Sequence, residues 1–192
     1  LEKLGRVLLP MLTPFDEQGE LNTKAMAELV DYIITQDYAD SLIVTGSTGE
    51  FYALSHAERL QAFEIVKEAN AGRLPLIAGT GATTTRETIA YTQAAEKVGY
   101  DCVMVVLPYY QKATQKGLYQ HYTAIAESTN LPVMVYNIPL FTGVNMEAQT
   151  LQRLVSDTSN ILGIKEEAGI NPTQTSEFNL VVPDEFTIFC GD

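Results

Sequence analysis

Asn160-Ile161-Leu162-Gly163-Ile164-Lys165-Glu166 is a short apolar run that ends abruptly in a lysine. The run is too short for a helix, so the pattern predicts a buried strand over 161–164 with Lys165 at its carboxyl end. A buried ammonium must be paired or neutralised, so stability alone does not explain a lysine here. In a parallel α/β barrel, the carboxyl ends of the strands form the active-site face. Lys165 is therefore a candidate for chemistry.

Two interpretations of this lysine stay open from these residues alone. A partly desolvated lysine at the end of a barrel strand can attack a carbonyl and form a Schiff base. Alternatively, Lys165 only marks the point where the strand meets solvent, paired with Glu166 or Glu167. No other lysine ends an apolar strand; the others lie in a terminus, in polar helical patterns or in a loop: Lys3, Lys24, Lys67, Lys97, Lys112 and Lys116.

The composition narrows the classes of function. With 192 residues and 46% hydrophobic content, the chain can bury a substantial core in one or two domains. The net charge of -12 argues against nucleic acid or an anionic membrane as a partner. We find no signal peptide and no apolar run of membrane length, so we expect a cytoplasmic protein.

The sulfur and imidazole side chains do not suggest a metal site. Cys102 and Cys190 each lie in an apolar, strand-like run, which predicts buried free thiols rather than a disulfide. His56 and His121 have no ligand-type spacing to a cysteine or to each other. We therefore expect no metal.

Strand and helix patterns alternate along the whole chain. The predicted strands cover 6–12, 40–44, 74–78, 102–107, 131–135, 161–164 and 186–190, and the predicted helices cover 23–36, 55–71, 84–98, 116–128, 147–156 and 171–182. Capping boxes at Ser55/Glu58 and Thr84/Glu87 open two of these helices. This alternation predicts βα units and a parallel sheet. With no linker or repeat, we expect a single domain over 1–192.

A barrel fits this pattern better than a doubly wound nucleotide-binding sheet. The latter usually carries a glycine fingerprint after a strand. Gly79-Thr80-Gly81 lacks the third glycine of that motif, and the chain contains no phosphate-binding loop of the G-x-x-x-x-G-K-[ST] type. We therefore predict a parallel α/β barrel.

Small, hydroxylated and aromatic residues follow several of the predicted strands. Gly46-Ser47-Thr48-Gly49-Glu50 offers backbone N–H groups and hydroxyls that could cradle a carboxylate or phosphate, although it could also be an ordinary turn. Tyr109, Tyr110 and Tyr136 could pack at the barrel mouth or face a ligand. Together with Lys165, these groups are the parts that a carbonyl-activating enzyme needs.

Four ordered motifs carry a resemblance to a known family. They are Gly46-Ser47-Thr48-Gly49-Glu50, Pro108-Tyr109-Tyr110, Tyr136-Asn137-Ile138-Pro139 and Gly163-Ile164-Lys165. In order and spacing the chain resembles the N-acetylneuraminate lyase and dihydrodipicolinate synthase family of class I, pyruvate-dependent aldolases on a (β/α)₈ barrel. The resemblance implies a C–C lyase that uses a lysine Schiff base and no separate cofactor.

The resemblance also implies roles for individual residues. Lys165 is similar to the Schiff-base lysine, and Tyr136 to the phenol that relays protons. Ser47 and Thr48, in a loop with Gly46 and Gly49, resemble the residues that hold the pyruvate carboxylate, with Ser47 joining the relay. Tyr110 resembles the tyrosine that completes this relay, which many members contribute across a dimer interface. We therefore expect a homodimer or homotetramer.

The chain departs from the family pattern at two places. The synthases carry an arginine two residues after the Tyr-Asn-x-Pro motif to bind the carboxylate of aspartate semialdehyde, and Phe141 occupies that place here. The sequence also stops at about the seventh strand, whereas a typical barrel has about 250 residues. We accordingly expect strands one to seven of the barrel, without its last βα unit and the carboxyl-terminal helices of the family.

These observations lead to one main hypothesis and two alternatives. The main hypothesis is an aldolase that joins or separates pyruvate and an aldehyde, acting on a 2-keto-3-deoxy sugar acid or on N-acetylneuraminate, with Phe141 packing against the substrate. The first alternative is 4-hydroxy-tetrahydrodipicolinate synthase, which condenses pyruvate with aspartate semialdehyde. The second is a non-catalytic barrel that binds a small acid.

Overall fold

The computed structural model describes residues 1–169 and 173–191. Its strands are β1 (Leu8–Pro10), β2 (Ser41–Val44), β3 (Leu76–Gly79), β4 (Cys102–Val106), β5 (Val133–Asn137), β6 (Ile161–Glu166) and β7 (Thr187–Cys190). Its α-helices are α1 (Thr23–Thr35), α2 (His56–Asn70), α3 (Thr85–Val98), α4 (Gln115–Glu127), α5 (Pro139–Thr142), α6 (Ala148–Asp157) and α7 (Thr173–Asn179). Short 3₁₀ turns, η1 (Glu2–Leu4) and η2 (Phe51–Ala53), complete the described elements.

The described strands follow one another in the sheet in chain order, from β1 to β7. The pairs β1–β2, β2–β3, β5–β6 and β6–β7 are all parallel. In the register of β5 and β6, Tyr136 lies opposite Lys165, and in that of β6 and β7, Lys165 lies opposite Phe189. The predicted parallel sheet of βα units is therefore confirmed.

By its internal contacts the chain divides into two compact units. The first unit contains residues 2–79 and 94–103, and the second contains residue 1 together with 80–93 and 104–192. That 1–192 forms a single domain stays a prediction.

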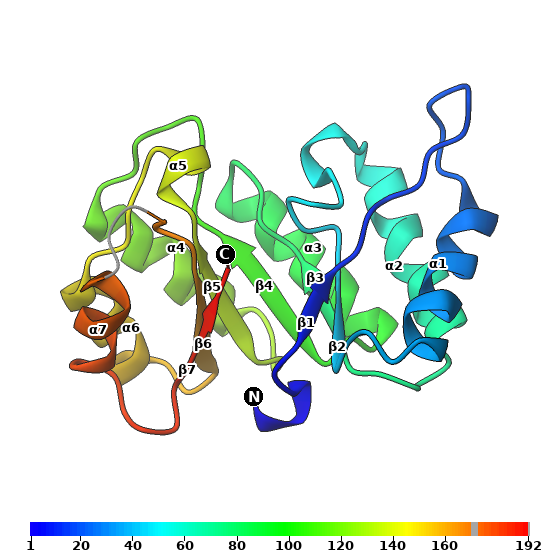
Figure 1. Ribbon diagram of the computed structural model, residues 1–192. Helices are drawn as coiled ribbons and strands as arrows, with labels where there is room; N and C mark the ends of the chain where they lie inside the picture. The colour runs from blue at the N-terminus through cyan, green and yellow to red at the C-terminus, as the bar shows by residue number, and fades with distance from the viewer. Residues whose placement is uncertain (170–172, 192) are drawn as a thin grey trace. The chain divides into compact units, whose positions relative to one another are not determined.

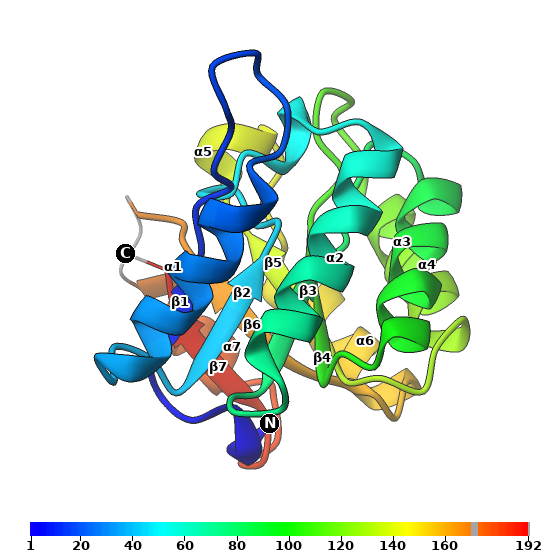
Figure 2. The same ribbon diagram turned by 90° about the vertical axis from the view of Figure 1, so that its right-hand side faces the viewer.

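In the first unit, α1 and α2 lie side by side, and α2 packs against β2 (Figure 2). The predicted capping box opens α2: the Glu58 amide donates to Ser55 Oγ, and the Ser55 amide donates to the Glu58 carboxylate. Phe63 from this helix is fully buried, and its carbonyl accepts a hydrogen bond of 3.0 Å from the Tyr100 hydroxyl. These contacts hold α2 in place. The predicted anion cradle lies in the loop before this helix.

In the second unit, α4, α6 and α7 gather beside β5 and β6 (Figure 1). Phe178 of α7 and Tyr122 of α4 are fully buried, and the Tyr122 hydroxyl donates to the Val105 carbonyl at 2.7 Å. Asn160, just before β6, donates from its side-chain amide to three backbone carbonyls in the 126–131 segment. This anchor fixes the start of the strand that carries Lys165.

Two predicted strand boundaries were wrong at the amino-terminal side. The first strand was predicted over 6–12, but β1 is only Leu8–Pro10. The amides of Arg6 and Val7 donate instead to the Asp40 carboxylate, at 2.7 and 2.8 Å. These bonds, from Val7 first and then Arg6, lower the pKa of Asp40 below its ordinary value.

In the second unit, two further predicted boundaries were wrong and one helix was missed. The fifth strand was predicted to end at residue 135, but β5 continues through Tyr136 and Asn137, because its ladder with β6 continues. The sequence also missed α5, which begins at Pro139 directly after β5. The last helix was predicted over 171–182; α7 ends at Asn179, and residues 171 and 172 lie outside the described part of the chain.

The two cysteines differ in environment. Cys102 in β4 is buried, as predicted. Cys190 is exposed, so the prediction of a buried thiol there was wrong. It ends β7, the last strand in the sheet order, where the other residues of the strand are also only half-buried.

Candidate active site

The predicted site residues Lys165 and Tyr136 meet on the second unit. They are register partners at the carboxyl ends of β6 and β5, so their side chains project from the same face of the sheet. The Lys165 Nζ atom lies 4.2 Å from the centre of the Tyr136 ring. The amine therefore lies over the face of the ring, within the distance of a cation–π contact.

A third residue, Glu167, joins them. Its Oε2 atom lies 3.1 Å from Lys165 Nζ and accepts a hydrogen bond of 2.6 Å from the Tyr136 hydroxyl. One carboxylate oxygen thus contacts both the amine and the phenol. Sequence reasoning considered Glu167 only as an ion-pair partner for the lysine. The signal that could have found it is its position two residues after Lys165, which returns its side chain to the same face.

The three groups are largely withdrawn from solvent. The side chains of Lys165 and Glu167 are 15% and 21% exposed, and Tyr136 is 2% exposed. Partial burial strengthens the interactions among them relative to a surface pair.

Glu166 has a different role from its neighbours. It is 6% exposed and points to the opposite face, where its carboxylate accepts hydrogen bonds from the Asn137 side chain and the Ala168 amide. Asn137 in turn accepts a bond from the Met146 amide at 3.0 Å. The ion pair with Lys165 is therefore made by Glu167, and Glu166 instead holds the ends of β5 and β6 in position.

The polar layer beneath the site continues into α7. Asn145 accepts a hydrogen bond from Asn137 and exchanges two with Gln174, at 2.8 and 2.9 Å. Asn137 and Gln174 are buried, at 0% and 4% exposed, whereas Asn145 between them is exposed, so this chain of amides reaches the surface. Its buried members are hydrogen-bonded, which favours one arrangement of the strand ends.

The predicted anion cradle lies on the first unit, after β2. Gly46 and Gly49 are buried, Ser47 is half-buried and Thr48 is exposed. The loop folds back on itself, because the Glu50 amide donates to the Ser47 carbonyl at 3.0 Å. A side chain at Gly49 would lie 2.9 Å from the Met11 carbonyl, so the close approach requires glycine. That this loop and Lys165 form one site stays a prediction.

The two remaining predicted residues are exposed on the second unit. Tyr110 is 91% exposed and adopts a positive φ of 72°, a strained conformation for a residue other than glycine. Phe141 lies on α5 and is 72% exposed. Neither has a described contact with Lys165, so their roles stay predictions.

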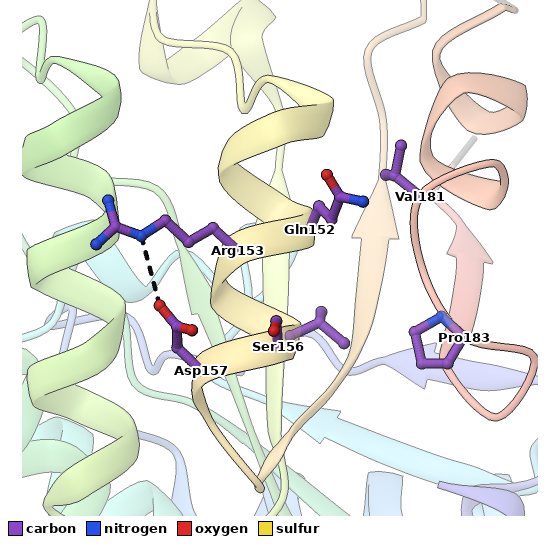
Figure 3. A pocket seen from close by; sticks show the side chains of 7 residues that line it. Gln152, Arg153, Ser156, Asp157, Val181 and Pro183 are labelled. Atoms are coloured by element: carbon purple, nitrogen blue, oxygen red, sulfur yellow. Dashed lines mark hydrogen bonds and ion pairs between the residues drawn. The ribbon is translucent and has the colours of Figure 1, made fainter.

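A hollow of about 460 Å³ lies elsewhere on the second unit (Figure 3). It is lined by Arg153 and Asp157 of α6 together with Val181 and Pro183. Arg153 Nε and Asp157 Oδ2 form an ion pair at 3.4 Å. Asp157 ends the helix that precedes β6, so the hollow lies toward the opposite end of that strand from Lys165. It contains none of the predicted site residues.

Among residues 1–169 and 173–191 there is no group of three or more histidine, cysteine or acidic side chains placed to hold a metal ion. Within the same residues, every helix is too short or too polar to cross a membrane.

The parallel order of the βα units, with a partly buried lysine at the carboxyl end of a strand, is typical of (β/α)₈ barrel proteins. The chain belongs to the dihydrodipicolinate synthetase family, whose model matches residues 3–192. The family and the (β/α)₈ class predicted from the sequence are thereby confirmed.

Individual relatives agree with this assignment. The chain is 48% identical over 188 residues to a 4-hydroxy-tetrahydrodipicolinate synthase of Desulforudis audaxviator, covering 98% of this chain and 63% of the relative. It superposes on dihydrodipicolinate synthase from Aquifex aeolicus with a TM-score of 0.94 and 35% identity, covering 97% of this chain and 63% of that one. The chain thus spans less than two thirds of the length of these relatives.

A further solved structure contains a ligand. It is YagE, a prophage protein of the dihydrodipicolinic acid synthase family from E. coli K12, in complex with pyruvate. The TM-score is 0.92 at 32% identity, with 98% of this chain and 64% of that one covered.

Proposed function

We propose that this protein is a pyruvate-dependent aldolase in which Lys165 forms a Schiff base with the keto carbon of pyruvate. The observation that carries the proposal is the contact of Lys165 with the Tyr136–Glu167 pair at the strand ends. An amine beside a phenol has both groups that carbinolamine formation and dehydration require: a nucleophile and a proton donor. The covalent link to pyruvate makes a separate cofactor unnecessary.

The remaining predicted residues complete the proposal. Ser47 and Thr48, with the backbone of Gly46 and Gly49, would hold the pyruvate carboxylate. Tyr136 would relay protons during C–C bond formation or cleavage. Tyr110 would complete the relay of a neighbouring subunit in a homodimer or homotetramer, and its 91% exposure in the single chain supports this role.

For the second substrate, the relatives favour the synthase reaction over the sugar-acid hypothesis. The relative that shares 48% identity is a 4-hydroxy-tetrahydrodipicolinate synthase. We therefore propose condensation of pyruvate with aspartate semialdehyde as the reaction of this protein.

One observation favours the second candidate, cleavage of a 2-keto-3-deoxy acid. Phe141 is 72% exposed and offers no hydrogen-bond donor to a substrate carboxylate. The carboxylate of aspartate semialdehyde would have no arginine to pair with at this position. Its desolvation would then cost about 1–3 kcal/mol or more. A sugar-like substrate, in contrast, can place its carbon face against the ring.

An activity comparison on the full-length protein distinguishes these candidates. The first arm measures condensation of pyruvate with aspartate semialdehyde, and the second measures pyruvate release from a panel of 2-keto-3-deoxy acids. We expect the larger kcat/KM in the first arm. A larger value in the second arm would assign the enzyme to the sugar-acid branch, and activity in neither arm would support a barrel that only binds a small acid.

A further inference from the structure

Glu167 is a charged group that contacts both side chains of the proposed reaction. Its Oε2 atom is 3.1 Å from Lys165 Nζ and 2.6 Å from the Tyr136 hydroxyl. A carboxylate that served only as a counter-ion would need the first contact alone. The second contact connects the amine to the phenol through a single oxygen atom.

The backbone holds this carboxylate in place from two sides. The Glu167 amide donates to the Asn137 carbonyl at 2.9 Å, which extends the β5–β6 ladder by one residue. On the β7 side, the Gly191 amide donates to the Glu166 carbonyl at 2.9 Å. A Cβ atom at Gly191 would lie only 2.5 Å from Glu167 Oε2. The glycine therefore avoids a clash with the carboxylate in this position.

We propose that Glu167 is a catalytic acid–base residue that carries protons between the amine of Lys165 and the phenol of Tyr136 during Schiff-base formation. The inference rests on the proposed function, because it concerns the same lysine and the same substrate. It adds a residue for which the sequence pattern suggested only an ion pair.

The proton count of the reaction shows where such a group acts. The Lys165 ammonium starts with three hydrogens, and the iminium nitrogen keeps one, so two protons leave on the pyruvate oxygen as water. The carboxylate of Glu167 takes the first proton and frees the amine, whose electron pair forms the new C–N bond. The carbonyl π electrons move to oxygen, which takes a proton from Tyr136, and Glu167 returns a proton to the phenolate.

The second half of the step repeats this path. The amine nitrogen of the adduct passes its second proton to Glu167, and Tyr136 delivers a proton to the leaving hydroxyl. Glu167 then returns its proton to the Tyr136 phenolate. Water departs with the C–O electrons, and the nitrogen lone pair forms the C=N bond. Nothing is oxidised or reduced, and Glu167 ends as a carboxylate beside the iminium cation, which it stabilises.

The test measures the rate at which pyruvate forms a borohydride-trapped adduct on the full-length protein, by mass spectrometry of timed quenches. Glu167→Gln keeps the size of the side chain but cannot take a proton at this site. We expect it to slow adduct formation about 10²-fold or more, as for removal of a general acid–base group. Glu185→Gln, which changes an exposed glutamate, is the matched control and should react at the unmodified rate.

Glu167→Ala provides a readout that a structural role would not produce. It leaves space for a small carboxylate, so added formate should raise its rate in a saturable way, while Glu167→Gln, whose space is filled, should not respond. Glu167→Asp, the conservative variant, should recover part of the rate. An unmodified rate in Glu167→Gln, or a slow Glu167→Ala that formate leaves unchanged, would overturn the inference.

The same experiment separates this inference from the function on which it rests. Lys165→Ala must abolish the adduct that the unmodified protein forms. An unmodified protein that forms no adduct would overturn the proposed function and the inference with it. An adduct that forms normally in Glu167→Gln but not in Lys165→Ala would overturn the inference alone.

Discussion

Lowering the pH should destabilise the fold through His121. This histidine of α4 is 5% exposed, its Nδ1 atom is 2.9 Å from Thr85 Oγ1, and its ring packs edge-on against Tyr122. Within the described residues, Nε2 is buried without a hydrogen-bond partner. Burial lowers the pKa of His121 from 6.5 to about 4, because the charged imidazolium would lose its hydration.

The sign and size of the effect follow from linkage. Between pH 6.5 and about 4 the unfolded chain binds a proton at this position and the folded protein does not, so stability is complete above 6.5 and falls as the pH drops. One pKa unit corresponds to about 1.4 kcal/mol, which gives a loss of about 2 kcal/mol at pH 5. For a domain of this size, that loss lowers Tm by roughly 4–8 °C.

Thermal unfolding at pH 7.5 and pH 5 measures this effect. The quantity to compare between variants is the difference in Tm between the two pH values. His121→Asn should lose part of the pH dependence, and His56→Asn, at an exposed position, is the matched control. An equal pH dependence in His121→Asn and the unmodified protein would refute the reasoning. The result also matters for catalysis, since a pH profile below about 6 would mix chemistry with unfolding.

Three further substitutions test the site and its support. Tyr136→Phe removes the hydroxyl but keeps the ring, and kcat should fall about 10²- to 10⁴-fold while the fold stays intact; full activity would exclude the phenol from the mechanism. Asn137→Ala removes a donor to the buried Glu166 carboxylate, so urea unfolding should show a loss of about 2–4 kcal/mol, and a loss below 0.5 kcal/mol would contradict the network described here. Phe141→Arg should leave adduct formation unchanged and raise kcat/KM for aspartate semialdehyde; slower adduct formation would place Phe141 against pyruvate itself.

Much of the fold could be predicted because periodicity reports burial directly. Apolar runs such as 102–106 are buried along their whole length, and Ser55 and Glu58 form the predicted capping box. Boundaries were less predictable, because they depend on partners distant in sequence. Asp40, for example, makes β1 begin late by binding the amides of Arg6 and Val7, which precede the strand.

The candidate site shows the same division. The sequence identified Lys165 and Tyr136, and strand register explains why they meet, since residues opposite each other in a parallel ladder share a face. The sequence could not assign Glu166 and Glu167 to their separate roles. That assignment depends on two features of the structure. Successive side chains at the end of β6 point to opposite faces of the sheet, and Asn137 binds the Glu166 carboxylate, so the Glu167 carboxylate pairs with Lys165.

The most direct test of the central claim is to locate the covalent adduct. The full-length protein is incubated with pyruvate, reduced with borohydride, digested and mapped by mass spectrometry. We predict one modified lysine, Lys165, and no modification of Lys112, in the loop between β4 and α4, or of Lys116, in the first turn of α4. A folded protein that gives no adduct, or an adduct on a lysine other than Lys165, would contradict the account.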